Sequence, residues 1–568
     1  MWLHLFILLI WVAIGTTFRL INLEAKPPWN DEFATMVFSL GNSFRTVPID
    51  RAISIDTLLQ PLQVNVAAGV DDVVAHLMRE STHPPVYFVL THWWMKLFPT
   101  TDIASFWAAR SLSVIFGIAA IPAMFGFGWL AFRSLFVGQV AAAMMAVSPY
   151  GIYLAQEARH YTLAILLIIA SLCCLITALR NIARCLPIPM WTCLCWIFVN
   201  CLGVAVHYFF TLALGAQALV LCGFWLQHQR QRMSANSAWH RLGAIALGTA
   251  IGVIVWVPIW QRVPEHQVTQ WIFADNSLNL FGILARLFAW IVTMVALLPI
   301  EGTNQVIAIA SGAILILFTI WVWQILHQGT KIQLQSLQTQ RATLVLIAYF
   351  STAIAVLLCI TFGTGADLTI AARYQFFYFP VVLILLASAL AINWQPRTWT
   401  SQGQFAGNLE QQKLLYSLKT QGKKAVLLIL VMGILGSLAV IYNFAYQKPD
   451  RPDLLVPLIQ EVSQVQTLIA TAHFTHEQIG EMMGLAFEFK SRDRIAKYDP
   501  LFLLAHLQPD SQTSIKTLEN TVAQLPKPLD LWVVNFFPVA EPAITGCVLD
   551  SHPRPKMNGY KHRLYHCL

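Results

Sequence analysis

Long apolar runs, separated by short polar segments, cover most of the chain up to about residue 446. By the criterion of ~20 apolar residues per crossing, this pattern predicts about eleven membrane-spanning helices. We expect them near residues 2–18, 106–131, 137–150, 162–179, 188–206, 209–226, 243–259, 306–326, 342–361, 375–393 and 425–443. The pattern is that of an α-helical polytopic membrane protein.

Two further apolar segments fit this alternation poorly. The segment His83–Phe98 is short, begins HPP and carries Tyr87, His92 and Lys96. The segment Phe281–Pro299 lies between polar residues that must face the same side of the membrane. We therefore expect both to be interfacial or re-entrant helices in external loops.

Basic residues cluster in short loops between the apolar runs, as the positive-inside rule requires of cytoplasmic loops. The clusters hold Arg133; Arg180 and Arg184; Arg230, Arg232 and Arg241; Lys331 and Arg341; Arg397, Lys423 and Lys424. They predict a cytoplasmic N-terminus and an extracytoplasmic C-terminus in the plasma (inner) membrane. The net charge of +8 thus reports topology and gives no reason to expect nucleic acid as a partner.

The composition strengthens this interpretation. Of 568 residues, 57% are hydrophobic and 11% are charged, and the mean hydropathy is +0.60. Soluble domains usually have about 25% charged residues, so a soluble globular protein is excluded. The first segment lacks a basic start and a small-residue cleavage site, so we expect a retained span rather than a signal peptide.

From about residue 447 the pattern changes, because charges return and the apolar runs shorten to strand length. Strands are predicted in TLIATA from Thr467, LFLLAHL from Leu501 and LDLWVVNFF from Leu529. Helical patterns occupy 453–465, 476–489 and 514–525. We expect two domains: a membrane domain over 1–446 and a small extracytoplasmic α/β domain over 447–568. Cys547 and Cys567 are expected to form a disulfide if that domain is extracytoplasmic.

Polar residues gather on the predicted outer face. Asp31 and Glu32 follow the first span in the stretch PPWNDEFATMVFSL. The other candidates share that face and are His83, Lys96, Arg110, Glu157, Arg159, His160, Tyr161, Arg373 and Tyr374. Acids in a desolvated place can act as general bases, and the planar fork of arginine matches a phosphate. This inventory predicts a site for an anionic substrate at a membrane surface.

Each candidate also has a purely structural interpretation. Glu157 and Tyr161 are four residues apart and can satisfy a helix end together with Arg159 or His160. Arg110, Lys96 and Arg373 fit the pattern of side chains that extend to the membrane surface. Asp31 with Glu157 and a histidine could hold a divalent metal, but their spacing is non-local, so the metal stays open.

The motifs in this order resemble the GT-C superfamily of polytopic glycosyltransferases, in the branch of the protein O-mannosyltransferases and the lipid A aminoarabinose transferase. The matching features are the acidic pair Asp31–Glu32, the HPP motif from His83, Arg110 at the start of the next span, and the segments SPYGIYLAQEARHYTL and ARYQFFYFP. The match runs through most of residues 1–395. It implies a GT-C type fold with about 11–13 transmembrane helices, each of ~20 residues.

The resemblance implies transfer of a sugar from a polyprenyl-phosphate donor to an acceptor hydroxyl on the extracytoplasmic face, with inversion. Asp31 would be the base, and Glu32 or Glu157 would orient it or the acceptor. Arg110, Arg159, Arg373 and Lys96 would bind the phosphate, and His83, His160, Tyr161 and Tyr374 would complete the substrate site. The acceptor is a glycan, a lipid or a protein. The alternatives are a flippase or transporter of lipid-linked sugars, and a glycan polymerase or ligase.

Overall fold

The computed structural model describes residues 2–230, 236–261, 272–273, 279–394, 409–491, 499–508, 511–538 and 542–568. The chain forms two compact units. Unit 1 contains Met1–Leu23 and Arg110–Gln447, and unit 2 contains Glu24–Ala109 and Lys448–Leu568. The sequence-based domains, 1–446 and 447–568, assign residues 24–109 to the membrane domain, whereas the compact units group them with the C-terminal residues.

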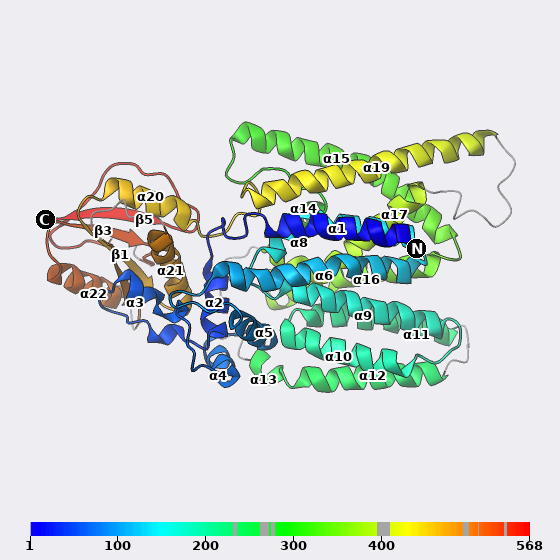
Figure 1. The fold of residues 1–568 in the computed structure, drawn as a ribbon, viewed down its shortest axis with the longest axis horizontal. Helices are drawn as coiled ribbons and strands as arrows, with labels where there is room; N and C mark the ends of the chain where they lie inside the picture. The colour runs from blue at the N-terminus through cyan, green and yellow to red at the C-terminus, as the bar shows by residue number, and fades with distance from the viewer. Residues whose placement is uncertain are drawn as a thin grey trace. The chain divides into compact units, whose positions relative to one another are not determined.

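Unit 1 is helical (Figure 1). Its elements are α1 (Trp2–Leu20), most of α6 (Phe106–Phe132), α7 (Leu135–Ala146), α8 (Pro149–Ala155), α9 (Tyr161–Ile182), α10 (Met190–Val206), α11 (Phe210–Arg230), α12 (Asn236–Ile254), α13 (Val257–Trp260), α14 (Leu280–Thr293), α15 (Gln305–Gln335), α16 (Gln340–Thr364), the 3₁₀ helix η4 (Ala372–Phe377), α17 (Phe379–Trp394) and α19 (Leu409–Ile441).

Within the described ranges, seven helices are long and apolar enough to cross a membrane, and the bent pair α7–α8 makes up to eight. All the spans predicted from the sequence coincide with helices, which confirms a polytopic α-helical membrane protein. The span expected over 137–150 differs in form, because α7 and α8 meet at an angle of 57°. The helix α7 ends at Ala146, and Ser148 caps the start of α8, its Oγ accepting a hydrogen bond from Gly151 N at 3.1 Å. Pro149 cannot continue α7.

The two segments expected to be interfacial are also helical. The first contains α5 (Val86–Met95) in unit 2, and the second contains α14 in unit 1. Both are shorter than a membrane-spanning helix, and their location at the membrane surface stays a prediction. Of the basic residues used to orient the spans, Arg232 and Arg397 lie outside the described residues.

A buried arginine connects α1 to α7 in unit 1. The guanidinium of Arg19 donates to the carbonyl oxygens of Gly15, Ala146 and Met145 at 3.0, 3.2 and 2.9 Å, and the side chain is fully buried. Carbonyl groups at the end of α7 carry the negative end of its helix dipole, so they suit a cation. The contact therefore fixes the end of α1 against the end of α7.

Unit 2 combines a five-stranded sheet with helices from both parts of the chain. The first part forms α2 (Asn30–Ser39), η1 (Phe44–Thr46), α3 (Ile55–Leu59), η2 (Gln60–Leu62), α4 (Val70–Glu80) and α5. The second part forms α20 (Pro452–Val462), β1 (Gln466–His473), α21 (His476–Ser491), β2 (Leu501–His506), α22 (Ser511–Gln524), β3 (Leu529–Val534), β4 (Cys547–Leu549) and β5 (His562–Cys567).

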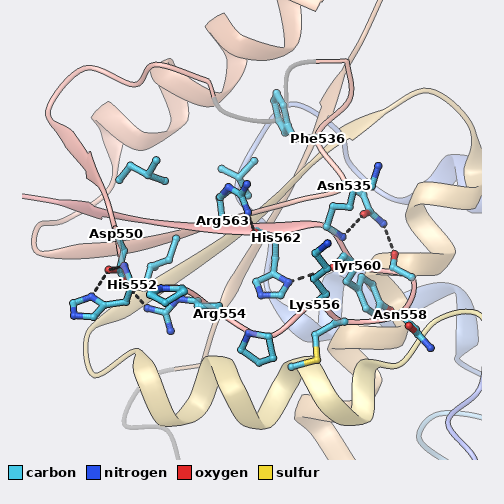
Figure 2. A pocket seen from close by; sticks show the side chains of 18 of the residues that line it. Asn535, Phe536, Asp550, His552, Arg554, Lys556, Asn558, Tyr560, His562 and Arg563 are labelled. Atoms are coloured by element: carbon cyan, nitrogen blue, oxygen red, sulfur yellow. Dashed lines mark hydrogen bonds and ion pairs between the residues drawn. The ribbon is translucent and has the colours of Figure 1, made fainter. Parts of the chain in front are cut away.

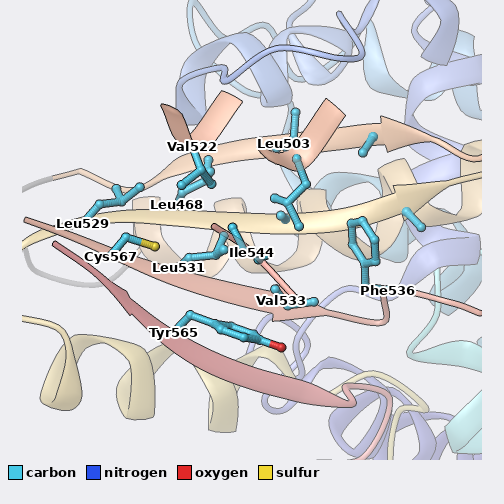
Figure 3. Packing of buried hydrophobic residues seen from close by; sticks show 14 residues of the cluster. Leu468, Leu503, Val522, Leu529, Leu531, Val533, Phe536, Ile544, Tyr565 and Cys567 are labelled. Carbon is cyan, nitrogen blue, oxygen red and sulfur yellow. The ribbon is translucent and has the colours of Figure 1, made fainter. Parts of the chain in front are cut away.

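The sheet has the strand order β2-β1-β3-β5-β4. Strands β1, β2 and β3 are parallel, whereas β5 is antiparallel to both β3 and β4. One face packs against α22 through an apolar core that includes Leu468, Leu531 and Val522 (Figure 3). On the other face Phe502 contacts Phe489 of α21, and Trp532 Nε1 donates to Ser463 Oγ at 2.9 Å. The three predicted strands and three predicted helices are confirmed, and the sequence analysis missed β4 and β5.

The first loop is hydrogen-bonded to the edge strand β2, which explains why it belongs to unit 2. Ile53 forms an antiparallel bridge with Phe502, with N–O distances of 2.9 and 2.8 Å. Asp50 N donates to Leu504 O at 2.9 Å, and the Asp50 carboxylate accepts from His506 N at 2.9 Å. The segment around Asp50 therefore covers the exposed edge of β2, although Asp50 and His506 are 456 residues apart in the sequence. At the opposite edge Cys547 and Cys567 form the disulfide that the sequence allowed.

Candidate active site

The acidic pair lies in the first turn of α2, in unit 2. The helix begins at Asn30, directly after the extended residue Trp29, and Glu32 N donates to Trp29 O at 2.8 Å. Pro27 and Pro28 precede it and keep the chain out of helix until that point. Carboxylates in a first turn interact favourably with the positive end of the helix dipole. Glu32 is fully buried and Asp31 is partly exposed.

Lys448 supplies a positive charge to this turn. Its Nζ lies 3.4 Å from Glu32 Oε2, and the exposed fractions of the two side chains are 2% and 0%. The ammonium group also lies over the Trp29 ring, 5.5 Å from its centre. A buried charge needs a partner of opposite sign, and this pair meets that need. Glu32 is thus held in place, and the neighbouring Asp31 is the more accessible acid of the two.

Two further carboxylates lie in this part of unit 2: Asp450 interacts electrostatically with Asp31, and Glu481 interacts with Asp450. Burial, then the negative charges of Glu481 and Asp31, raise the pKa of Asp450 to about 7. Burial also raises the pKa of Glu481, although the hydrogen bond from Asn535 Nδ2 at 3.0 Å opposes this. Asp450 therefore holds a proton over part of the neutral range, near an acid predicted to be a base.

Two glycines allow these segments to approach one another. A Cβ at Gly480 would lie 2.0 Å from Asn30 Oδ1, so α21 can pack against the start of α2 only without a side chain there. Gly559 has φ +80°, and a Cβ there would lie 2.5 Å from Asp450 Oδ1. The site in unit 2 is thus assembled from α2, residues 448–450, α21 and the loop before β5.

His83 and Lys96 lie at the two ends of the α5 segment. His83 Nδ1 is 2.9 Å from Ser81 Oγ, and its ring contacts Phe88 with 6.0 Å between centres. Lys96 follows the last residue of α5, is exposed, and its Nζ lies 3.5 Å from Ala68 O. These contacts hold the two ends of a short helix whose first turn begins after Pro85.

In unit 1, the turn between α8 and α9 carries four predicted site residues. Glu157, Arg159, His160 and Tyr161 are all buried, with exposed fractions of 1–2%. Ser113 of α6 holds the turn, because its Oγ donates to Arg159 O at 2.8 Å and accepts from Arg159 N at 3.3 Å. The turn is therefore a built feature of the helix bundle, with little of its side-chain surface accessible to solvent.

The segment η4 brings Arg373 and Tyr374 to the same region of unit 1. Phe376 of η4 contacts Tyr161 with 5.7 Å between ring centres. His207 bridges the two segments, lying 4.3 Å from the His160 ring and 4.7 Å from the Phe376 ring. Tyr374 packs against Phe209 at 4.9 Å, and the Arg373 guanidinium lies 5.3 Å from the centre of the Tyr374 ring.

Arg110 and Glu157 complete the group in unit 1. Arg110, in the first turns of α6, is fully buried and donates to Leu23 O at 2.7 Å. It is therefore not a side chain that simply extends to the membrane surface. Glu157 and Arg373 both interact electrostatically with Tyr153 of α8. The structure thus brings the predicted residues of unit 1 together around α8, α9 and η4.

The sequence analysis missed the roles of several residues. Lys448, Asp450 and Glu481 follow about 400 residues after the acidic pair and carry no local motif, so only the fold reveals them. In unit 1, Arg286 of α14 forms an ion pair with Asp367, and Trp290 of the same helix donates to Thr369 O at 2.9 Å. An arginine inside an apolar segment was the available signal for this pair.

The metal that the sequence left open would need a cluster of ligand side chains. Among those residues, no group of three or more His, Cys, Asp and Glu side chains is arranged to hold a metal ion. Burial raises the pKa of both Asp450 and Glu481, and for Asp450 the negative charges of Glu481 and Asp31 add to it. The divalent metal that the sequence left open has therefore no ligand cluster among the described residues and stays untested.

Comparisons with known proteins identify the fold. No protein-family model and no curated protein sequence matches the chain. Among solved structures, ArnT from Cupriavidus metallidurans bound to undecaprenyl phosphate matches with a TM-score of 0.52 and 11% identity, covering 98% of this chain and 97% of that one. The same protein in its apo state gives 0.51 and 12% over the same shares. The likeness extends through both units, so the chain has the fold of this ArnT structure, as the resemblance in the sequence implied.

Proposed function

We propose that the protein is an inverting membrane glycosyltransferase that moves a sugar from a polyprenyl-phosphate donor to an acceptor hydroxyl. The observation that carries the proposal is Asp31, a partly exposed acid in the first turn of α2 beside the buried Glu32–Lys448 pair. The likeness of the fold to a structure bound to undecaprenyl phosphate supports the class of donor.

The reaction is a single displacement. Asp31 accepts the proton of the acceptor hydroxyl. At the same time the oxygen of that hydroxyl attacks the anomeric carbon of the sugar from the face opposite the phosphate. The bond between that carbon and the phosphate oxygen breaks, and the polyprenyl phosphate leaves with the electron pair. The configuration at the carbon inverts. Lys448 holds Glu32, and this fixes the turn that carries Asp31.

Cations must stabilise the charge that develops on the leaving phosphate. Arg110, Arg159 and Arg373 in unit 1 are suited to this, because a guanidinium binds phosphate oxygens through two parallel hydrogen bonds. Glu157 in the same group orients the acceptor, and His160, packed against Tyr161 and His207, contributes to the substrate site with Tyr374. Lys96, exposed at the end of α5, is the weaker candidate for phosphate binding.

The disulfide supports an extracytoplasmic reaction. Cys547 and Cys567 are bonded in unit 2, the unit that also carries Asp31. Disulfides persist in oxidising compartments and are rare in the cytosol. We therefore place unit 2 on the extracytoplasmic side, which agrees with the basic loops of the predicted topology.

The test is transfer by the purified protein in nanodiscs, with labelled undecaprenyl-phosphate sugars as donors. We expect Asp31→Asn to lower the rate by about 10²–10⁴-fold, the range for loss of a general base. The asparagine has the same shape, so folding should be retained. Melting temperature measured by intrinsic fluorescence checks this.

Asp56→Asn is the matched control. Asp56 is an acid of unit 2 whose side chain is 77% exposed and which pairs with Lys490 at 3.1 Å. We expect this variant to transfer at the rate of the unchanged protein. A transfer rate in Asp31→Asn within about threefold of the unchanged protein would contradict the assignment of Asp31 as the base. Such a change is well below the tenfold in rate that about 1.4 kcal/mol of activation free energy produces.

A further inference from the structure

Unit 2 contains a hollow that the proposed reaction does not use. Its volume is about 1020 Å³, and it is lined by the segment after β3, by β5 and by the loop between β4 and β5 (Figure 2). Ligand pockets usually have volumes of roughly 300–1,000 Å³. The hollow is therefore large enough for a ligand of several sugar rings, and much larger than a simple ion needs.

The lining is strongly basic. Its lysines and arginines are Arg554, Lys556, Lys561 and Arg563, and Asp550 is its one acid. Arg554 is already engaged, because it forms an ion pair with Asp550 and lies 5.3 Å from the centre of the Trp532 ring. Hydrogen bonds from His552 and Arg554 hold the pKa of Asp550 well below its usual range. The positive charges of Lys556 and Lys561, both exposed, face a ligand in the hollow.

The loop that carries these cations is held in shape by Asn535. The Asn535 backbone N donates to Lys561 O, and Lys561 N donates to Asn535 Oδ1, both at 2.8 Å. Asn535 Nδ2 donates to Gly559 O, also at 2.8 Å. The disulfide between β4 and β5 closes the other end of the loop. A site formed before its ligand arrives loses less conformational entropy on binding.

The remaining lining suits a saccharide. Phe537 presents a ring that is 47% exposed, with Lys561 Nζ 4.9 Å from its centre. An exposed ring beside a cation offers an apolar surface for the face of a sugar and a charge for its acidic group. Asn558, exposed at the rim, carries an amide that can both donate to and accept from hydroxyl groups.

We propose that the hollow between β5 and the β4–β5 loop binds a saccharide that carries phosphate or carboxylate groups. The anionic groups contact Lys556 and Lys561, and a sugar ring stacks on Phe537. This site stands independently of the transferase activity, because it involves neither Asp31 nor the arginines of unit 1.

The test uses the full chain in nanodiscs of phosphatidylcholine. The probes are fructose 1,6-bisphosphate and trigalacturonate, with maltotriose as the neutral counterpart, and binding is followed by thermophoresis. We expect both anionic probes to bind, maltotriose to bind at least tenfold more weakly, and Lys561→Ala to weaken anionic binding about tenfold. Absence of binding by both anionic probes, or equal binding of maltotriose, would overturn the proposal.

The matched control is Lys516→Ala, which removes the same charge from the exposed surface of α22, outside the hollow. Binding should be unchanged in this variant, and equal weakening in Lys516→Ala and Lys561→Ala would contradict the proposal. Phe537→Leu removes the stacking surface and keeps the positive charges. We expect it to weaken the binding of trigalacturonate without altering the melting temperature.

Nanodiscs with phosphatidylglycerol distinguish the source of the anionic group. A lipid headgroup in the hollow would compete with fructose 1,6-bisphosphate, and the competition would disappear in Lys561→Ala. Equal affinity in both kinds of nanodisc is expected for a soluble saccharide. Competition that is removed by Lys561→Ala would overturn the assignment to a saccharide.

Discussion

The two compact units hold buried charge in different ways. In unit 2, the buried carboxylate of Glu32 lies 3.4 Å from the buried ammonium of Lys448. In unit 1, the buried guanidinium of Arg19 donates to three backbone carbonyls of α1 and α7. A helix bundle supplies carbonyl groups at its helix ends, each with a partial negative charge, whereas the turn of α2 must recruit a whole charge from elsewhere in the chain.

This difference bears on function, because an ion pair depends on both partners. If Lys448 is lost, Glu32 keeps a full charge in a buried place. If Arg19 is lost, the carbonyls keep only partial charges that neighbouring backbone groups share. Unit 2 should therefore be the more sensitive of the two to loss of a single buried cation.

The largest effect is expected for Lys448→Met. Breaking a buried pair by removing one partner costs about 3–5 kcal/mol, because the other charge is left uncompensated. We expect a clear fall in melting temperature, followed by intrinsic fluorescence in detergent. Glu32→Gln combined with Lys448→Met should recover most of the loss. A double variant no more stable than Lys448→Met would show that the pair itself is not the cause.

Removal of the disulfide tests the other support of unit 2. Cys547 and Cys567 close a loop with a separation of 20 residues, for which the chain-entropy model gives about 3 kcal/mol. We expect Cys547→Ser with Cys567→Ser to lower the melting temperature of unit 2, and a reducing agent to do the same to the unchanged protein. Cys185→Ser, at an exposed free cysteine of unit 1, is the control. Insensitivity of the unchanged protein to reductant would argue against a structural role of the disulfide.

A smaller effect is expected for Arg19→Met in unit 1. The hydrogen bonds of a charged donor contribute about 1.5–3 kcal/mol, and the methionine keeps part of the packing. The loss should therefore be less than that of Lys448→Met, measured in the same detergent. An equal or larger loss would contradict the comparison, since buried carbonyls would then tolerate the loss of their cation no better than a buried carboxylate does.

The sequence predicts the helices and strands of both units better than it predicts the residues that surround Asp31. The spans of unit 1 follow from long apolar runs, and the three parallel strands of unit 2 follow from short ones, because both patterns are local. Strands β4 and β5 were missed, since CVL is only three residues long and HRLYHC is rich in polar residues. The partners of Asp31 were missed for a different reason. Lys448, Asp450 and Glu481 reach α2 only because the first loop joins the C-terminal sheet.

The last effect is a pH dependence, set by the proton on Asp450. Its pKa is raised to about 7 by burial and by Glu481 and Asp31, so between pH 4 and 7 the folded protein binds a proton that the unfolded chain releases. Stability should therefore fall as pH rises through this window. Asp450→Asn, which stays neutral, should melt at a similar temperature to the unchanged protein at pH 4.5 and at a higher one at pH 8.

The matched control for this pH dependence is Asp453→Asn, an acid of the same unit that pairs with Arg451 at 2.7 Å. It should bring no gain in melting temperature at pH 8, because its charge already has a partner. A gain in Asp450→Asn that is equal at pH 4.5 and pH 8 would mean that the substitution acts through packing rather than through the proton. A gain confined to high pH would show that the folded protein favours the neutral form of Asp450, because this carboxyl is buried and lies near the negative charges of Glu481 and Asp31.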